Sequence, residues 1–305
     1  MRTGYLGPEG TVSHEALLAA DPHAAAVPLA TLRDVVLAVQ ERRLERALVP
    51  VENALEGGVD PVLDALGLDA PDVRIVGELI QPVSYCLAAA AALPLDAIRE
   101  VISHPQASGQ CARFLRTRLA HAAVVAAAST ADAVRGVAAG GEPGPRRAAG
   151  APAGAGAREP AARAALGTRF AAERYGAVVL ADAVEDDPGN ATRFAWLAPA
   201  DAAPEPPADG PPASGAKTAL VFWGAGSASP GWLVDCLMGF AEGAVNLTRI
   251  ESRPLRKGMG EYMFFLDLEG SIAEPRVADA IARLRRHAGH VRVLGSFPAA
   301  AARAG

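Results

Sequence analysis

The sequence predicts an α/β protein that carries a second, α+β domain at its C-terminal end. Three observations support this fold class. Strand-like and helix-like segments alternate through the first 198 residues, a proline-rich stretch follows, and the remaining segments come in the order βαββαβ. Alternation of strands and helices is typical of α/β layers with mostly parallel strands. The order βαββαβ is the ferredoxin-like split βαβ arrangement.

Composition limits the classes of protein that need to be considered. The chain has 305 residues, of which 50% are hydrophobic, and a formal net charge of −5. At roughly 100–200 residues per domain, this length indicates about two domains. The apolar content excludes global disorder, and the negative charge argues against general nucleic-acid binding.

Targeting and redox signals point to the cytoplasm. The N-terminus has no apolar signal region and no segment is apolar enough to span a bilayer, so we expect a cytoplasmic protein without a membrane partner. Cys86, Cys111 and Cys236 lie far apart in the sequence. An odd, sparse set of cysteines fits reduced buried thiols better than disulfides or a zinc site.

Local signals place the elements of the first region. Thr31 is a predicted helix N-cap, Asp60 and Pro61 begin another helix, and Ser103 with Gln106 resembles a capping box. Strands are expected at 2–6, 47–51, 73–79, 83–88, 101–103, 124–127, 178–181 and 192–197. Helices are expected at 11–20, 31–40, from 60, 103–119, from 130 and 169–175.

The C-terminal region has its own series of elements. Strands are expected at 217–223, 245–251, 262–268 and 291–295, and helices at 230–241 and 275–287. Proline stands at the start of both helices, where its missing N–H is tolerated.

Two segments lack the periodicity that a buried face requires. Residues from about 140 to 165 are mostly Gly, Ala, Pro and Arg, and they predict a low-complexity surface insertion within a patterned region. Residues 199–216 are rich in proline and alanine and predict an interdomain linker.

Polar residues gather at the ends of predicted strands, where open α/β sheets bind their ligands. Each group also has a structural explanation as a turn or a helix cap, and the residues alone leave both open. The groups are the glycine turn at 7–11, Glu52-Asn53, Ser103 to Gln106 with Gln110 and Cys111, Ser129-Thr130, and Thr192-Arg193-Phe194.

Arg193 illustrates the alternatives. Alternation sends Thr192 and Phe194 to one face of their strand and Arg193 to the other. Arg193 is then either an ordinary residue paired with a carboxylate or a bidentate clamp for a substrate carboxylate. The sequence lacks dinucleotide, Walker and His/Cys metal-ligand patterns, so we expect neither a cofactor nor a metal.

At these positions the sequence resembles prephenate dehydratases of the monofunctional bacterial type, which carry a C-terminal regulatory ACT domain. The resemblance covers nearly the whole chain, and the order and spacing of its short motifs make it specific. The matching segments are 4–11, 49–53 with Glu56-Gly57, 103–106 with Gln110-Cys111, 190–194, 246–254 and 260–262.

The resemblance implies a catalytic domain at 1–198, built of two lobes like a periplasmic binding protein with the active site in the cleft between them. Lobe one would be about 1–77 and 178–198, and lobe two about 78–177. The linker at 199–216, an ACT domain at 217–298 and a tail at 299–305 complete the chain.

The implied reaction is the decarboxylating dehydration of prephenate to phenylpyruvate in L-phenylalanine biosynthesis. Aromatisation of the ring drives the loss of CO₂ and the 4-hydroxyl, so no cofactor is needed. Thr192 maps to the family's essential threonine, and we expect it to act as an oriented donor that relays a proton from water or Glu52. The implied catalytic residues are Thr192, Arg193, Glu52, Asn53, Ser103 and Gln110, and the implied substrate-binding residues are Gly10, Thr11, His104, Ser129, Thr130 and Phe194.

The ACT resemblance implies feedback regulation by L-phenylalanine, bound between paired domains of a dimer or tetramer. The implied effector-binding residues are Gly231, Trp232, Leu233, Val234, Asn246, Leu247, Glu251, Ser252, Arg253 and Pro254. Trp232 stands where the family has alanine, and a tryptophan there would fill part of the effector pocket. Ala54 likewise replaces a family serine.

Three other functions compete with this one. Arogenate dehydratase performs the same chemistry on the amino form of the substrate, and relative turnover of the two would separate them. A non-aromatising prephenate decarboxylase should lack both the threonine and the ACT domain. A non-catalytic amino-acid sensor would bind L-phenylalanine without turning over prephenate.

Overall fold

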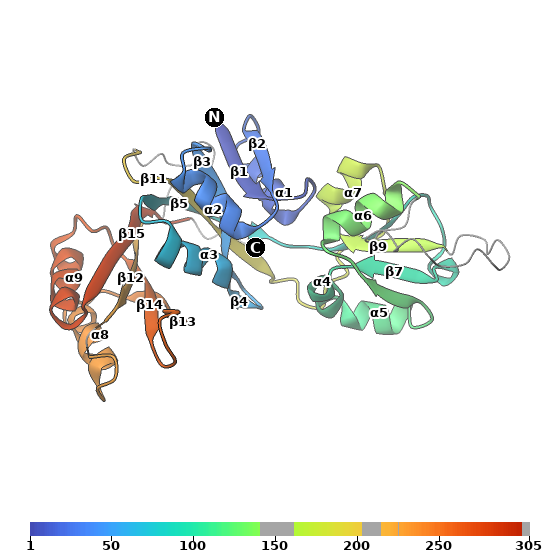
Figure 1. The fold of residues 1–305 in the computed structure, drawn as a ribbon. Helices are drawn as coiled ribbons and strands as arrows, with labels where there is room; N and C mark the ends of the chain where they lie inside the picture. The colour runs from blue at the N-terminus through green and yellow to red at the C-terminus, as the bar shows by residue number, and fades with distance from the viewer. Residues whose placement is uncertain (141–161, 203–214, 225, 301–305) are drawn as a thin grey trace. The chain divides into compact units, whose positions relative to one another are not determined.

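The computed structural model describes residues 1–140, 162–202, 215–224 and 226–300, and Figure 1 shows its ribbon. The described chain forms two compact units. The first unit comprises Met1–Leu6, Ala16–Gln81 and Ala191–Gly305, and the second comprises Gly7–Glu15 and Pro82–Asn190.

A six-stranded mixed sheet, called the first sheet below, forms one part of the first unit. Strand β1 runs parallel to β2 and β3, whereas β11 runs antiparallel to β3. The strand order is β2 (Ala25–Leu29), β1 (Arg2–Leu6), β3 (Arg46–Asn53), β11 (Ala191–Pro199) and β5 (Val73–Pro82), with β4 (Gly57–Gly58) paired to β3. Its helices are α1 (Val12–Ala20), which crosses the boundary of the units, α2 (Leu32–Gln40), α3 (Asp60–Asp64) and the π-helical turn η1 (Ala65–Asp69).

The C-terminal domain, residues 216–300, forms the other part of the first unit. Its four strands are antiparallel in the order β13-β14-β12-β15, which confirms the predicted βαββαβ arrangement. The elements are β12 (Ala216–Trp223), α8 (Trp232–Glu242), β13 (Leu247–Pro254), β14 (Tyr262–Glu269), α9 (Pro275–His287) and β15 (His290–Pro298).

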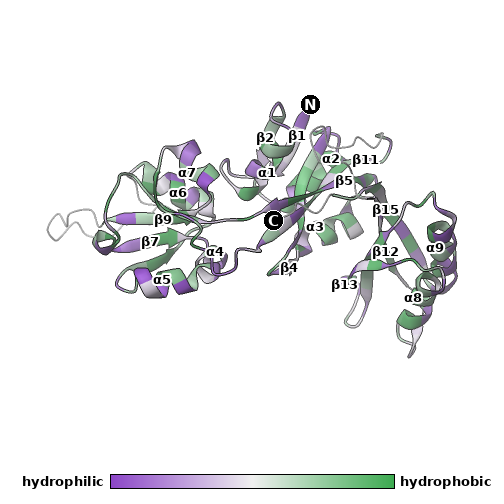
Figure 2. Ribbon diagram, turned by 180° about the vertical axis from the view of Figure 1, so that it is seen from behind, coloured by the Kyte–Doolittle hydropathy of each residue, from purple (hydrophilic) through white to green (hydrophobic). Residues whose placement is uncertain are grey.

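The sheet of the C-terminal domain is covered on both faces. One face carries Phe222 and Leu266, which join α8 and α9 in a core of their own. In α9 the buried residues Val277, Ala280, Ile281 and Leu284 recur at helical spacing, and the helix is striped in both colours in Figure 2. The other face carries Val221, Met263 and Phe265, which belong to the core beneath the first sheet. Alternation along the strands therefore joins this domain to the first sheet by a continuous apolar core.

The second unit contains a five-stranded sheet in the order β10 (Val178–Ala181), β6 (Cys86–Ala89), β9 (Arg163–Gly167), β7 (Glu100–Ser103) and β8 (Ala123–Ala126). Its helices are α4 (Pro105–Gln110), α5 (Ala112–Arg118), α6 (Thr130–Ala138), α7 (Arg169–Tyr175) and the 3₁₀ turn η2 (Leu95–Ala97). Cys86 and Cys111 are buried in its core, and Cys236 is buried in the C-terminal domain. All three are free thiols, as predicted.

Several predicted elements need correction. The strands expected at 73–79 and 83–88 are in fact β5 through Pro82 and the separate β6. The helix expected at 103–119 is broken at Cys111 into α4 and α5. Strands β2 and β9 were not predicted because their segments are rich in alanine and poor in β-branched residues.

The boundaries also differ from those expected. Most of the predicted insertion, residues 141–161, and most of the predicted linker, residues 203–214, lie outside the described residues, but the end of the insertion belongs to β9. Strand β10 pairs with β6 in the second unit, although residues 178–181 were assigned to lobe one. The described ranges contain no helix long and apolar enough to cross a bilayer. They also contain no group of three or more acidic, histidine or cysteine side chains suited to a metal ion.

Candidate functional site

Thr192 and Asn53 form a hydrogen-bonded pair at the end of the first sheet. The two residues face each other across the antiparallel strands β11 and β3. Asn53 Nδ2 donates to Thr192 Oγ1 at 3.0 Å, while Asn53 Oδ1 accepts from the backbone N–H groups of Leu55 at 3.0 Å and Glu56 at 3.1 Å. Because the Asn53 oxygen must face these donors, the orientation of the amide is fixed.

The pair determines what the Thr192 hydroxyl can do. An oxygen that already accepts from Asn53 directs its own O–H elsewhere, so Thr192 is available as a hydrogen-bond donor. Thr192 is only 9% exposed, which shields that donor from competing water.

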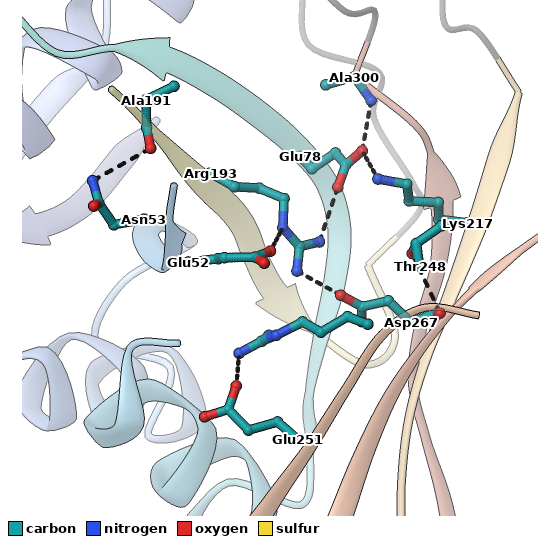
Figure 3. A network of polar contacts seen from close by, with 11 residues as sticks. Glu52, Asn53, Glu78, Ala191, Arg193, Lys217, Thr248, Glu251, Asp267 and Ala300 are labelled. Atoms are coloured by element: carbon teal, nitrogen blue, oxygen red, sulfur yellow. Dashed lines mark hydrogen bonds and ion pairs between the residues drawn. The ribbon is translucent and has the colours of Figure 1, made fainter. Parts of the chain in front are cut away.

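Arg193 lies on the opposite face of β11 and is surrounded by carboxylates (Figure 3). Its Nε lies 2.9 Å from Glu52 Oε2, its Nη1 lies 3.1 Å from Glu78 Oε2, and its Nη2 lies 2.5 Å from Asp267 Oδ2. Burial alone would lower the pKa of Arg193, but the three carboxylates outweigh it and raise the pKa above the ordinary value. Of the two readings of Arg193, the structure shows the ion-paired residue and gives no support to the substrate clamp.

The C-terminal domain supplies half of this network. Asp267 belongs to β14, and Lys217 Nζ at the start of β12 lies 2.9 Å from Glu78 Oε1. The backbone N–H of Ala300 donates to the same Glu78 oxygen at 2.9 Å. Glu78 and Arg193, both on the first sheet, therefore each pair with a charged side chain of the C-terminal domain as well as with each other.

Glu52 does not take the position expected of a proton source. It faces Arg193 across the strands, and it neighbours Asn53 in β3, so the two side chains point to opposite faces of the sheet. Thr192 lies on the Asn53 face. The expected relay of a proton from Glu52 to Thr192 is therefore wrong for this geometry.

In the second unit, the predicted site residues have structural hydrogen bonds. Ser103 Oγ is buried and donates to the Leu166 carbonyl at 3.0 Å, so it is not the expected helix cap. His104 is the N-cap of α4 instead, since its Nδ1 accepts from the Gln106 N–H at 3.3 Å. Gln110 Oε1 accepts from Asn190 Nδ2 at 3.0 Å.

Ser129 caps α6 as predicted. Its Oγ accepts from the Asp132 N–H at 3.0 Å, and Thr130 is the first residue of the helix. Both residues stand at the positive end of the helix dipole.

The glycine turn of the second unit is internally satisfied. The N–H of Gly10, an implied substrate-binding residue, donates to His14 Nδ1 at 3.1 Å. The Tyr175 hydroxyl donates to the Glu9 carbonyl at 2.6 Å. Gly10 has φ +83°, and a Cβ there would lie 2.8 Å from the Tyr175 ring, so both backbone and packing require glycine. Thr11 Oγ1 accepts from the His14 N–H at 3.3 Å.

The predicted effector motif at 251–254 is divided between the two faces of β13. The carboxylate of Glu251 lies beside Gly58, and Arg253 Nε pairs with Asp64 Oδ1 at 3.0 Å, so both side chains face elements of the first sheet. Ser252 and Pro254 are exposed, as are Val234 on α8 and Asn246 before β13.

Trp232 belongs to the core of the C-terminal domain. It is 8% exposed, packs 5.9 Å from the rings of Phe222 and Phe264, and donates from Nε1 to the His287 carbonyl at 2.9 Å. Gly231 before it is the N-cap of α8 with φ +86°, a left-handed conformation that favours glycine.

Sequence reasoning missed Glu78, Lys217 and Asp267. A signal was present, because Glu78 stands between the apolar pairs 75–76 and 79–80, and Asp267 interrupts the apolar run 263–268. A charge in such a setting requires a partner. Nothing local identifies that partner, since Asp267 lies 74 residues from Arg193.

The first unit thus presents a shielded threonine hydroxyl, held by an asparagine, at the end of a mixed sheet. Residues 3–202 match the family model described as prephenate dehydratase. The chain therefore belongs to the prephenate dehydratase family, whose members are lyases that dehydrate and decarboxylate prephenate.

Relatives agree over nearly the whole chain. A prephenate dehydratase of Mycobacteroides abscessus is 35% identical, over 97% of this chain and 90% of its own length. A solved prephenate dehydratase from Arthrobacter aurescens, in complex with L-Phe, is 30% identical with a TM-score of 0.82, over 99% of this chain and 94% of that chain. A solved protein named GqqA, described as a novel type of quorum quenching acylase, is 28% identical with a TM-score of 0.78, over 98% of both chains.

Proposed function

We propose that this chain converts prephenate to phenylpyruvate, with Thr192 as the catalytic hydroxyl. The observation that carries the proposal is the hydrogen bond from Asn53 Nδ2 to Thr192 Oγ1, which directs the threonine proton away from Asn53. In the reaction, the electrons of the breaking bond to the carboxylate carbon enter the ring as CO₂ departs. The C4–O bond breaks with its electron pair, and the leaving hydroxide takes a proton from water.

The Thr192 hydroxyl is too weak an acid to supply that proton by itself, so its role is electrostatic. A fixed donor directed at the oxygen where negative charge develops stabilises the transition state more than the ground state. The water that delivers the proton replaces Glu52 in this mechanism, because Glu52 is held by Arg193 on the other face.

We propose further that the two compact units act as the lobes of a binding-protein-like catalytic domain. Residues of the second unit would then bind the two carboxylates of prephenate, as the resemblance implies. The position of Ser129 and Thr130 at the N-terminus of α6 supports this role, since the helix dipole favours anions there. Gln110, His104, Gly10 and Thr11 remain proposed contacts.

The C-terminal domain is proposed to be a regulatory ACT domain that binds L-phenylalanine in a dimer or tetramer. The βαββαβ order and the L-Phe complex of the Arthrobacter relative support this. We propose that the exposed residues of the predicted motifs, among them Ser252 and Val234, lie on the effector side. Glu251 and Arg253 would instead hold the domain to the first sheet.

The test is phenylpyruvate formation from prephenate by the purified protein, with and without L-phenylalanine. Thr192→Ala should abolish turnover while leaving the unfolding transition unchanged. Thr117→Ala is a matched control because Thr117 Oγ1 donates only to the backbone of its own helix, at Arg113 and Phe114. Full activity in Thr192→Ala would refute the assignment. Faster turnover of arogenate, or binding of L-phenylalanine without turnover, would favour the competing functions instead.

Acyl-amide hydrolysis, suggested by the name of GqqA, requires an activated nucleophile. Burial raises the pKa of Cys86 and Cys236 to about 11 and that of Cys111 to about 12, which keeps these thiols protonated. The three thiols therefore give no support to an acylase activity, and conversion of prephenate remains the function we propose.

A further inference from the structure

The ion pair of Arg193 with Glu52 lies directly beside the proposed catalytic pair. Thr192 and Arg193 are successive residues of β11, and Asn53 and Glu52 are successive residues of β3. The two cross-strand pairs are therefore adjacent steps of one ladder, one on each face of the sheet. A shift of the Arg193 backbone would reach Thr192 directly, because one peptide bond joins the two residues.

The strand pairing at this point is irregular, so it relies on side chains. Arg193 is opposite Glu52, but the next residue, Phe194, is opposite Pro50, which leaves Val51 as an extra residue in β3. Such a bulge interrupts the ladder and re-aims neighbouring side chains. The direction of the Thr192 hydroxyl then depends on whatever holds this end of β11.

Arg193 is held from the C-terminal domain. Its side chain is 13% exposed and that of Asp267 is 10% exposed, so their ion pair is largely shielded from water. A cavity of about 20 Å³, enough for a single water, lies against Arg193, Asp267 and Arg249. Loss of the Asp267 charge would leave Arg193 Nη2 without its carboxylate and draw the guanidinium toward the two that remain, Glu52 and Glu78.

A second set of contacts links the C-terminal domain to the Arg193 guanidinium, through Glu78. Glu78 is 1% exposed and binds Arg193 Nη1, while Lys217 and the Ala300 N–H bind its other oxygen. The C-terminal domain therefore contacts Arg193 directly through Asp267 and indirectly through Lys217 and Glu78 (Figure 3).

We infer that Asp267 and Lys217 are positioning residues for the Thr192 hydroxyl, so that the C-terminal domain completes the catalytic site even without an effector. The inference rests on the proposed prephenate dehydratase function. Asp267 acts directly on Arg193, and Lys217 acts through Glu78. Neither residue touches Thr192.

A second ion cluster between the same two parts of the chain provides a matched control. Asp64 of α3 is buried and pairs with Arg253 and Arg256 of the C-terminal domain. It has no ion pair or hydrogen bond with β11 among the described residues. If the charged contacts served only to dock the domain, loss of Asp64 and loss of Asp267 would have the same consequence.

The experiment compares Asp267→Asn with Asp64→Asn in the full-length protein. We expect Asp267→Asn to lower kcat by about 10- to 100-fold with KM changed less than twofold, since misplacement of a transition-state donor by 1 Å can cost on the order of 100-fold. Asp64→Asn should keep kcat within twofold, even if both variants unfold at lower temperature. Equal kcat values in the two variants would overturn the inference.

Lys217→Gln serves as the second variant if Asp267→Asn does not fold, with a smaller fall in kcat expected. Hydrogen exchange of the backbone amides in residues 191–197 gives a readout independent of turnover. Exchange should be faster in Asp267→Asn than in the wild type and unchanged in Asp64→Asn; unchanged exchange in both would also overturn the inference. A wild type that forms no phenylpyruvate would refute the proposed function, and the exchange comparison would still decide the positioning role.

Discussion

The contact between the C-terminal domain and the first sheet can be tested at one glycine. Gly295 of β15 packs against the backbone of Ile75 in β5, and a Cβ at Gly295 would lie 2.0 Å from the Ile75 carbonyl oxygen and 2.9 Å from its carbon. An ordinary carbon–oxygen contact is about 3.3 Å, so Gly295→Ala must push the two backbones apart by roughly 1.3 Å. Unlike a side chain, a strand carbonyl cannot rotate out of the way.

Overpacking of this kind costs about 1–3 kcal/mol, and we expect Gly295→Ala to lower the free energy of unfolding by that amount. Urea unfolding followed by tryptophan fluorescence measures it. Gly77→Ala is the matched control, because Gly77 lies in β5 as well and the atom nearest to its added Cβ would be in Trp196, at an ordinary contact distance of 3.4 Å. If the two alanine variants were equally stable, the close approach of β15 to β5 would be refuted.

Gly295→Ala should also lower activity. Arg193 Nη2 and Asp267 Oδ2 lie 2.5 Å apart, and moving the two strands apart by more than 1 Å would take this pair beyond hydrogen-bond distance. We therefore expect kcat to fall with KM nearly constant, as for Asp267→Asn. A variant that is destabilised yet retains wild-type kcat would separate the docking of the domain from the positioning of Thr192.

Three further predictions concern single side chains. Asn53→Ala should lower kcat on the order of 100-fold in the phenylpyruvate assay, because the Thr192 oxygen loses the donor that orients it. Burial holds the pKa of His14 below 6.5. The imidazole therefore takes up a proton more readily in the unfolded chain than in the native protein. The free energy of unfolding should then fall as the pH drops below about 6.5. Urea titrations at several pH values would show it, and a slope that His14→Gln left unchanged would argue against His14 as the source. Cys86 and Cys111 should react slowly with a thiol reagent at neutral pH until the protein unfolds, since burial raises both pKa values; rapid labelling of the native protein would contradict this.

Much of the fold follows from signals that act over a few residues. Thr31 and Ser129 were predicted as N-caps, and each side chain accepts from the N–H three residues further on. The βαββαβ order followed from periodicity and proline positions alone. By contrast, β9 could not be predicted, because Arg163–Gly167 has the composition of the low-complexity stretch before it and becomes a strand only by pairing between β6 and β7.

For the site, alternation predicted which residues share a face but not what they meet. Thr192 and Arg193 point to opposite sides of β11, as expected. The proposed catalytic hydroxyl therefore lies on one face of the strand, and the ion pairs that hold the strand lie on the other. The partners of Arg193 come from 141, 115 and 74 residues away, and no local pattern specifies pairings of that range. Only the apolar neighbours of Glu78 and Asp267 along their strands indicated that these carboxylates need buried cations as partners.

The burial of Arg193 also changes where the charge for substrate binding must come from. An acidic chain needs local positive potential to attract a dianion, and Arg193 would have been the obvious source. Its charge is instead offset by three carboxylates, one of them contributed by the C-terminal domain. In the positioning role we infer, Arg193 fixes the end of β11 beside Thr192. A chain that lost Asp267 would therefore keep the Thr-Arg-Phe motif intact and still lose the orientation of the Thr192 hydroxyl.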